Sequence, residues 1–332
     1  MTRHDEIAAF LKRCGFGTAR IAPLAQDASF RRYWRLTGGP RPAVLMDAPP
    51  PEDVRPFLHI AGHLAGLGLS VPDILAADPD IGFVLEEDLG DNLLSILLDS
   101  AVPPPADLFD AAVDALAVIQ RAPPPADLPS WDAAFMAETA MGTLFDWWWP
   151  TRYGRAAPHA ARADVAAALD VILRPVAEGP RVLVHRDFFA GNLIHLPDRT
   201  GPRAAGIIDF QGAALGHPAY DLLSLVQDAR RDIPPALADR AVTQFLAARP
   251  ELDRAAFDAA FAACAAQRHL RVACQWVRLA RRDGKPQYLA YGPRTWALLS
   301  RALTHPAVAP LAQALDRWIP AADRGNPPGL AA

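Results

Sequence analysis

Two short polar segments flank a stretch of chain that predicts a β-hairpin. The first segment, residues 185–192, reads HRDFFAGN, and the second, residues 207–210, reads IIDF. A strand leaving the first segment would turn near residues 198–201 and return along residues 205–208. Because a hairpin brings its two ends together, we expect Asp187, Asn192 and Asp209 to converge. Two carboxylates and one amide supply the hard oxygen ligands that Mg²⁺ prefers.

These residues have the types and the spacing that phosphoryl transfer requires. One acid accepts or orients the proton of the attacking hydroxyl, and an Asn and a second Asp hold the metal against the phosphates. The order HxDxxxxN, hairpin, apolar-apolar-Asp-Phe is typical of kinase catalytic loops. The alternative is that the acids cap loops and that His185 is a core residue. For His185 alone that alternative stays open.

Composition excludes several classes of function. The chain has 332 residues, enough for roughly two domains, with 33 Lys and Arg against 37 Asp and Glu and a net charge of −4. Nucleic-acid and anionic-membrane binders are usually basic, so we expect neither partner. No apolar run is long enough to span a bilayer, and the first residues lack the apolar centre of a signal peptide. We therefore expect a cytoplasmic protein, and nothing indicates an obligatory protein partner.

The first 85 residues predict a small β-rich lobe. Residues 30–36 and 43–48 are rich in aromatic and aliphatic residues and are separated by a turn signal, Thr37-Gly38-Gly39-Pro40, so they predict a hairpin. The other expected elements are helices at 5–14 and 52–67 and short strands at 74–76 and 82–85.

Residues 91–320 predict a larger helical lobe that contains the hairpin described above. A short junction, residues 86–90, connects the two lobes, and residues 321–332 form a tail. The helices are expected at 93–100, 107–121, 131–149, 163–175, 218–230, 236–247, 254–281 and 293–303. The fold class is α+β, and the lobes are expected to face one another across a ligand-binding cleft.

The motifs HRDFFAGN and IIDFQ resemble those of the aminoglycoside phosphotransferase/choline kinase superfamily, small-molecule relatives of protein kinases. Further segments are similar to the anomeric sugar kinases of cell-wall recycling, which phosphorylate C1 of N-acetylmuramate and N-acetylglucosamine. These segments are DASFRRY at 27–33, VLMDAPP at 44–50, YDLLSL at 220–225 and RDGKP at 282–286. The resemblance covers most of the chain. It implies a two-lobed protein-kinase-like fold and an ATP- and Mg-dependent kinase acting on a small amino sugar.

The resemblance also implies roles for individual residues. Asp187 matches the catalytic base, and Asn192 and Asp209 match the metal ligands. Asp221 matches an acid that braces the catalytic loop from a helix, with His185 also in a structural role. The residues matched to nucleotide binding are the hinge residues Glu86 and Asp88, through their backbone, and Ser29, Phe30 and Arg31.

The sequence departs from the kinase pattern at two places. The segment expected over the phosphates, residues 27–33, contains no glycine, although its backbone N–H groups and Ser29 could still meet phosphate. The third strand, residues 44–47, has no lysine. Arg31, Arg32 and Arg35 are the nearest candidates for the missing cation, and a solvated strand face is the alternative for all three.

The sugar site is less well marked. Glu138 and the run Trp147–Trp149 offer a polar group and aromatic platforms, although core packing is favoured for the tryptophans. Arg268, Arg271, Gln275, Arg278 and Arg282 recur at helical spacing, either as a wall for an anionic substrate or as a solvated face. Glu138 and Arg271 are the candidate substrate contacts.

Two further interpretations remain open. The chain could be another superfamily kinase, acting on an aminoglycoside, choline, homoserine or thiamine, although the arginine-rich C-terminal region disfavours polycationic substrates. It could also be a nucleotide-binding pseudokinase because the strand lysine is missing. The presence of Asp187, Asn192 and Asp209 disfavours the pseudokinase.

Overall fold

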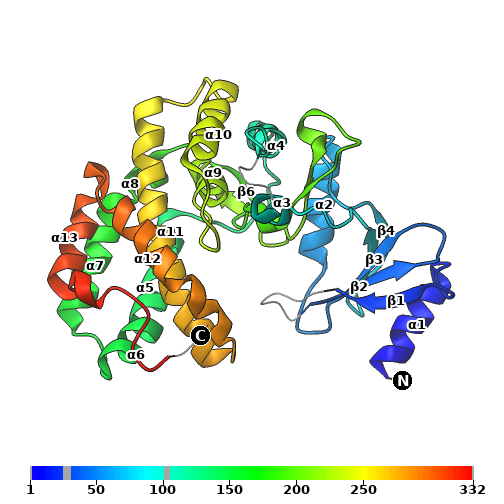
Figure 1. The fold of residues 1–332 in the computed structure, drawn as a ribbon, viewed down its shortest axis with the longest axis horizontal. Coiled ribbons are helices and arrows are strands. Elements are labelled where there is room, and N and C mark those ends of the chain that lie inside the picture. The colour runs from blue at the N-terminus through cyan, green and yellow to red at the C-terminus, as the bar shows by residue number, and fades with distance from the viewer. Residues whose placement is uncertain (1, 25–30, 101–104, 331–332) are drawn as a thin grey trace. The chain divides into compact units, whose positions relative to one another are not determined.

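The computed structural model describes residues 2–24, 31–100 and 105–330, and its elements are labelled in Figure 1. The chain divides into two compact units. Residues 1–119 and 190–213 form the first, and residues 120–189 and 214–332 form the second. These bounds differ from those of the predicted lobes, because the hairpin after Asn192 groups with the N-terminal residues.

The first unit contains a five-stranded antiparallel sheet in the order β1-β2-β3-β5-β4. Its strands are β1 (Arg20–Pro23), β2 (Arg32–Thr37), β3 (Ala43–Asp47), β4 (Ile74–Asp78) and β5 (Phe83–Glu87). The predicted hairpin of β2 and β3 is confirmed, as are the strands β4 and β5. The sequence analysis missed β1, a four-residue edge strand that is exposed throughout and carries no alternating pattern.

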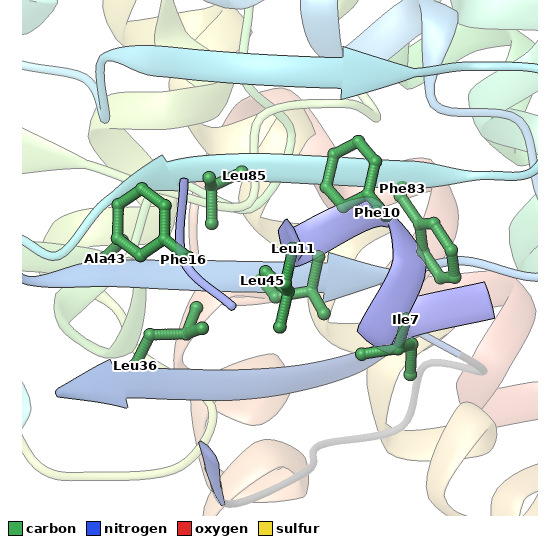
Figure 2. Packing of buried hydrophobic residues seen from close by; sticks show 9 residues of the cluster. All are labelled: Ile7, Phe10, Leu11, Phe16, Leu36, Ala43, Leu45, Phe83 and Leu85. Atoms are coloured by element: carbon green, nitrogen blue, oxygen red, sulfur yellow. The ribbon is translucent and has the colours of Figure 1, made fainter. Parts of the chain in front are cut away.

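Helix α1 (Arg3–Arg13) covers one face of this sheet, and Figure 2 shows the core that results. Ile7, Phe10 and Leu11 of α1 pack against alternate residues of three strands, among them Leu45 and Phe83. Because side chains alternate along a strand, Tyr33, Arg35, Val44, Met46, Val84 and Glu86 lie on the opposite face. The α1 face therefore forms a hydrophobic core, and Val44, Met46, Val84 and Glu86 are buried on the opposite face.

The remaining elements of the first unit include the predicted hairpin. Its strands are β7 (Leu193–His195) and β8 (Ala205–Ile207), which pair antiparallel. Backbone hydrogen bonds from Ile207 to Ser70 and from His195 to Asn92 tie it to the rest of the unit. The helices are α2 (Arg55–Gly66), α3 (Leu94–Ser100) and α4 (Asp110–Arg121), at whose end the second unit begins, with short 3₁₀ turns η2 (Ala190–Asn192) and η3 (Gly201–Ala204).

The second unit is mainly helical and is built around the 29-residue helix α11 (Arg254–Arg282). This helix packs against α5 (Ala133–Gly142), α9 (Ala219–Val226) and α12 (Gly292–Ala302). The other elements are α7 (His159–Ile172), α8 (Arg174–Glu178), α10 (Pro235–Ala248), α13 (Ala309–Trp318), β6 (Val182–Val184), β9 (Ala214–Gly216), and the 3₁₀ turns η4 (Pro286–Tyr291), η5 (Pro306–Val308) and η6 (Ala321–Asp323). Strands β6 and β9 pair antiparallel.

One predicted helix of this unit is interrupted. The stretch expected as a single helix over 131–149 consists of α5, a π-helical turn η1 (Thr143–Trp148) and α6 (Trp149–Tyr153). Pro150 has no N–H to donate, so a regular α-helical ladder cannot continue through it. The tryptophan run therefore lies where the helix changes its winding.

The C-terminal tail is held against the second unit. Asp323 accepts hydrogen bonds from Arg152 and from the hydroxyl of Tyr153, at 2.6 and 3.0 Å. The indole N–H of Trp148 donates to the carbonyl of Gly325 at 2.8 Å.

Among the described residues, no helix combines the length and the apolar character needed to cross a bilayer.

Candidate active site

The hairpin of the first unit brings two of the three predicted oxygen-bearing side chains together. Asn192 directly precedes β7, Asp209 follows β8 by two residues, and the amide of Ile208 donates to the carbonyl of Asn192. The side-chain nitrogen of Asn192 lies 3.5 Å from Oδ2 of Asp209. On the other side, the side-chain nitrogen of Gln211 donates to Oδ1 of Asp209 at 2.7 Å. One amide oxygen and one carboxylate are thus available in the same place.

The position of Asp209 is fixed by backbone conformation and by packing. Its φ of +62° lies in the left-handed region, which is uncommon for a residue with a side chain. The next residue, Phe210, is fully buried and stacks on Phe57 of α2, with ring centroids 4.7 Å apart. The aromatic anchor leaves the Asp209 carboxylate exposed. Such strain is typical of residues held for function.

The sheet face opposite α1 lies close to this pair. Burial raises the pKa of the Tyr33 hydroxyl, and the nearby carboxylates of Glu86 and Asp209 raise it further. Tyr33 of β2 therefore lies near both Glu86 of β5 and Asp209. Met46 of β3 also lies on this face, on the strand where protein kinases carry lysine.

Glu86 is unusual on this face because it carries a buried carboxyl group. Its side chain is 6 % exposed, and among the described residues Oε2 has no hydrogen bond. Desolvation disfavours the carboxylate and raises the pKa of Glu86 to about 8. At neutral pH this side chain is mainly a neutral acid that can donate a hydrogen bond as well as accept one.

The three arginines proposed to replace the strand lysine have different surroundings. Arg31 is buried, pairs with Glu52 at 3.2 Å and hydrogen-bonds the Tyr33 side chain. Arg35 is bound by Asp88 and Asp91, and Arg32 is exposed. Only Arg31 among them is both buried and connected to the residues around Asp209. The adjacent candidates Ser29 and Phe30 lie outside the described residues.

Asp88, the other predicted hinge residue, uses its side chain within the hinge. Its carboxylate binds Arg35 at 2.7 Å and accepts the backbone N–H of Gly90 at 2.9 Å. These contacts fix the backbone that follows β5 and leave any nucleotide contact here to main-chain groups.

The segment that carries Asp187 belongs to the second unit and is braced by Asp221 of α9. Asp221 is fully buried and accepts the backbone N–H of His185 at 2.6 Å and that of Arg186 at 2.9 Å. Burial raises the pKa of Asp221 to about 6, against the opposing effects of His185 and of the two backbone donors. The His185 ring is buried, packs edge-on against Phe188, and its Nδ1 accepts the N–H of Asp187 at 3.3 Å.

Asp187 itself is exposed at the end of this braced turn. Its carbonyl accepts the N–H of Phe189 at 3.1 Å. Its convergence with Asn192 and Asp209 stays a prediction from their spacing.

The sequence analysis missed an aromatic and cationic cluster beside this segment. The guanidinium of Arg186 lies over the ring of Trp131, 4.1 Å from its centroid, and that of Arg271 lies 5.7 Å from it. Trp131 is 1 % exposed and contacts Tyr220 edge to face. No sequence spacing links residues 131, 186 and 271, so only the fold could reveal this cluster.

The other residues predicted for the sugar site have different surroundings. Glu138 lies exposed on α5. Trp148 and Trp149 are buried, and Trp148 packs against Trp296, so these two rings belong to the core. Arg271 is the predicted substrate contact that lies within the cluster.

Comparison with known proteins identifies close sequence relatives. N-acetylmuramate/N-acetylglucosamine kinase of Caulobacter vibrioides is 38% identical over 96% of this chain and 97% of its own length. The protein of the same name from Pseudomonas aeruginosa is 37% identical, over 90% of this chain and 88% of its own.

Solved structures with low sequence identity share the fold. A choline/ethanolamine kinase family protein from Mesorhizobium loti superimposes with a TM-score of 0.66 at 14% identity, covering 95% of this chain and all of its own. The GDP complex of aminoglycoside 2'-phosphotransferase-IIIa gives 0.61 at 13% identity, over 92% and 99%. The predicted protein-kinase-like fold is thereby confirmed. Residues 20–257 match the phosphotransferase enzyme family, to which this chain belongs.

Proposed function

We propose that this protein is a kinase that transfers the γ-phosphoryl group of a nucleoside triphosphate to the anomeric hydroxyl of N-acetylmuramate and N-acetylglucosamine. The observation that carries the proposal is the similarity to four kinases named for these two sugars, at 34–38% identity. The proximity of Asn192 and Asp209 supports the chemistry, because phosphoryl transfer needs an Asn and an Asp that can hold the metal ion against the phosphates.

The donor atoms at the hairpin fit a magnesium ion carried by a nucleotide. Mg²⁺ is usually bound through one or two carboxylates together with substrate phosphates, and it prefers oxygen. The carboxylate of Asp209 and the amide oxygen of Asn192 are such ligands. Bound Mg²⁺ would neutralise the charge that develops on the phosphates. Gln211 orients the Asp209 carboxylate through the hydrogen bond to Oδ1.

Arg31 is the residue we propose as the phosphate-binding cation. It is held by Glu52 and Tyr33, on the side of the sheet where Asp209 lies. A guanidinium presents several donors to phosphate oxygens and remains charged when buried. The strand lysine can thus be replaced by an arginine that directly precedes the adjacent strand, β2. The backbone of Glu86–Asp88 is proposed to meet the nucleotide base.

Asp187 is proposed as the catalytic base that accepts the proton of the sugar hydroxyl. Its carboxylate is exposed and hence accessible to a substrate, whereas the backbone before it is fixed by Asp221. The bracing fixes the backbone that carries Asp187, and a base held in position is more effective. Asp221 is a positioning residue in this scheme.

The proposal places the activity in the cytoplasm, where nucleoside triphosphates are available, with the amino sugar as a small-molecule partner. It is tested by incubating the protein with Mg·ATP and a panel of hydroxyl acceptors while following ADP release. We expect turnover with both amino sugars. Turnover with choline or kanamycin and none with the amino sugars would reject the proposal.

A further inference from the structure

Two arginines of the second unit face the same aromatic ring from different elements. Arg186 comes from the segment after β6 and Arg271 from the middle of α11, and both guanidinium groups lie over Trp131 at 4.1 and 5.7 Å from its centroid. Cations are attracted to the face of an indole, and a ring can hold them in a fixed position.

The polar partners of Arg271 are all neutral. Its two terminal nitrogens donate to the side-chain oxygen of Gln275 at 2.9 Å and to the hydroxyl of Tyr220 at 3.2 Å. One turn earlier on α11, Arg268 is 5 % exposed and donates to the hydroxyl of Ser224 at 2.8 Å. Neither Arg268 nor Arg271 forms an ion pair with a carboxylate in the part of the chain that the structure describes.

The charges in this cluster disfavour one another. Burial lowers the pKa of Arg186 and the charge of Arg271 lowers it further, whereas Asp187, Tyr220 and Asp221 raise it. Buried charges usually have a counter-ion, since an uncompensated guanidinium in a region of low dielectric is costly. Arg271, whose hydrogen-bond partners are neutral, is therefore suited to an anion that arrives with a ligand.

The backbone also indicates that the direction of Arg186 is functional. Its φ is +74°, in the left-handed region, and its N–H is held by Asp221. Such a conformation is strained in a residue with a side chain and persists only where the surroundings impose it. Here it coincides with the placement of the guanidinium over Trp131 and next in sequence to the proposed base.

We propose that Arg186 and Arg271 bind the carboxylate of N-acetylmuramate and thereby determine the preference for this sugar over uncharged N-acetylglucosamine. The inference rests on the proposed function, since it takes both sugars as substrates. Arginine matches carboxylate geometry with paired N–H donors, and charge-assisted hydrogen bonds of this kind are strong. The phosphates of the nucleotide are the other anionic groups in the proposed reaction. The experiment below distinguishes binding of the sugar carboxylate from binding of these phosphates.

The test compares the wild-type protein with Arg271→Gln, Arg271→Lys and a control, Arg254→Gln. Arg254 lies at the exposed start of the same helix, paired with Asp258, so its substitution also removes one positive charge from α11. The measurements are kcat/KM for each sugar, KM for ATP, and the Kd of N-acetylmuramate by calorimetry without nucleotide.

We expect the ratio of kcat/KM for N-acetylmuramate to that for N-acetylglucosamine to fall at least tenfold in Arg271→Gln, the effect of losing one charge-assisted contact. The Kd of N-acetylmuramate should rise by a similar factor, Arg271→Lys should recover part of the loss, and Arg254→Gln should match the wild type. Equal losses for both sugars, or a rise in KM for ATP with an unchanged ratio, would overturn the inference.

The failure of the proposed function would look different. A wild-type protein that phosphorylates neither sugar would refute the kinase proposal. The calorimetric Kd would then still decide the carboxylate site, since binding that is equal in wild type and Arg271→Gln, or absent from both, contradicts it.

Discussion

Replacing Glu86 by glutamine should remove a large pH dependence from the stability of the protein. Glutamine has nearly the same shape but cannot ionise. In the folded state, burial raises the pKa of Glu86 from its ordinary 4.5 to about 8. The folded protein therefore binds this proton more tightly than the unfolded chain does. The contribution of Glu86 to stability is complete below pH 4.5 and is lost as the pH rises to about 8.

The size of the effect follows from the two pKa values. One pKa unit corresponds to about 1.4 kcal/mol, so the rise from 4.5 to about 8 gives at most about 5 kcal/mol. Between pH 5 and pH 8.5 most of this, about 4 kcal/mol, should be lost by the wild type and retained by Glu86→Gln. Other titrating groups are shared by the two proteins and cancel in the difference.

The assay is urea unfolding at pH 5 and pH 8.5, followed by the fluorescence of the eight tryptophans. Glu87→Gln is the matched control, because Glu87 is the next residue and points to the other face, where it pairs with Arg199 at 3.0 Å. That substitution removes the ion pairs of Glu87 with Arg199 and Arg41, at 3.0 and 3.7 Å, and should bring no gain at high pH. If the difference in the free energy of unfolding between Glu86→Gln and the wild type is the same at both pH values, the pKa of Glu86 is not raised by burial and the reasoning is refuted.

Four further substitutions test the proposed roles. Asp187→Asn should lower kcat by about 10²–10⁴-fold with an unchanged circular dichroism spectrum, and near-normal turnover would mean that the base is wrongly assigned. Asp209→Asn should raise the Mg²⁺ concentration needed for half-maximal activity, so an unchanged magnesium titration would contradict its role as a ligand. Arg31→Gln should raise KM for the nucleotide about tenfold or more without a comparable change for the sugar, and an equal change in both KM values would speak for a general loss of structure. Asp221→Asn leaves one of two buried backbone donors without a good acceptor, so the free energy of unfolding should fall by about 1–3 kcal/mol and kcat should fall with it; an unaltered melting temperature would show that the bracing is unimportant.

The parts of the fold that local sequence determines could be predicted. The turn at Thr37–Pro40 and the alternation on either side specify the hairpin of β2 and β3, and the proximity of Asn192 and Asp209 follows from the hairpin between them. Both depend on residues that are neighbours in the chain. The position of Asp187 in the HxDxxxxN motif predicts its role as the catalytic base, but it does not predict which residues surround it.

The features that were missed depend on contacts between distant segments. The cluster of Trp131 with two arginines joins three elements, and no periodicity connects them. Likewise, the ion pairs of Arg35 with Asp88 and Asp91 join residues that are far apart in the sequence. Because Arg35 is engaged in these ion pairs, Arg31 is left as the candidate cation. Short exposed strands such as β1 carry too little pattern to be recognised, since only pairing with β2 defines them.

The position of the new phosphate on the sugar tests the central claim most directly. The protein should be incubated with Mg·ATP and N-acetylglucosamine, and in parallel with its methyl glycoside, whose anomeric oxygen is blocked, with the products followed by ³¹P NMR. We expect a sugar 1-phosphate, ADP in equal amount, and no product from the methyl glycoside. Phosphorylation of the methyl glycoside, or a phosphate on any other hydroxyl of the free sugar, would contradict it.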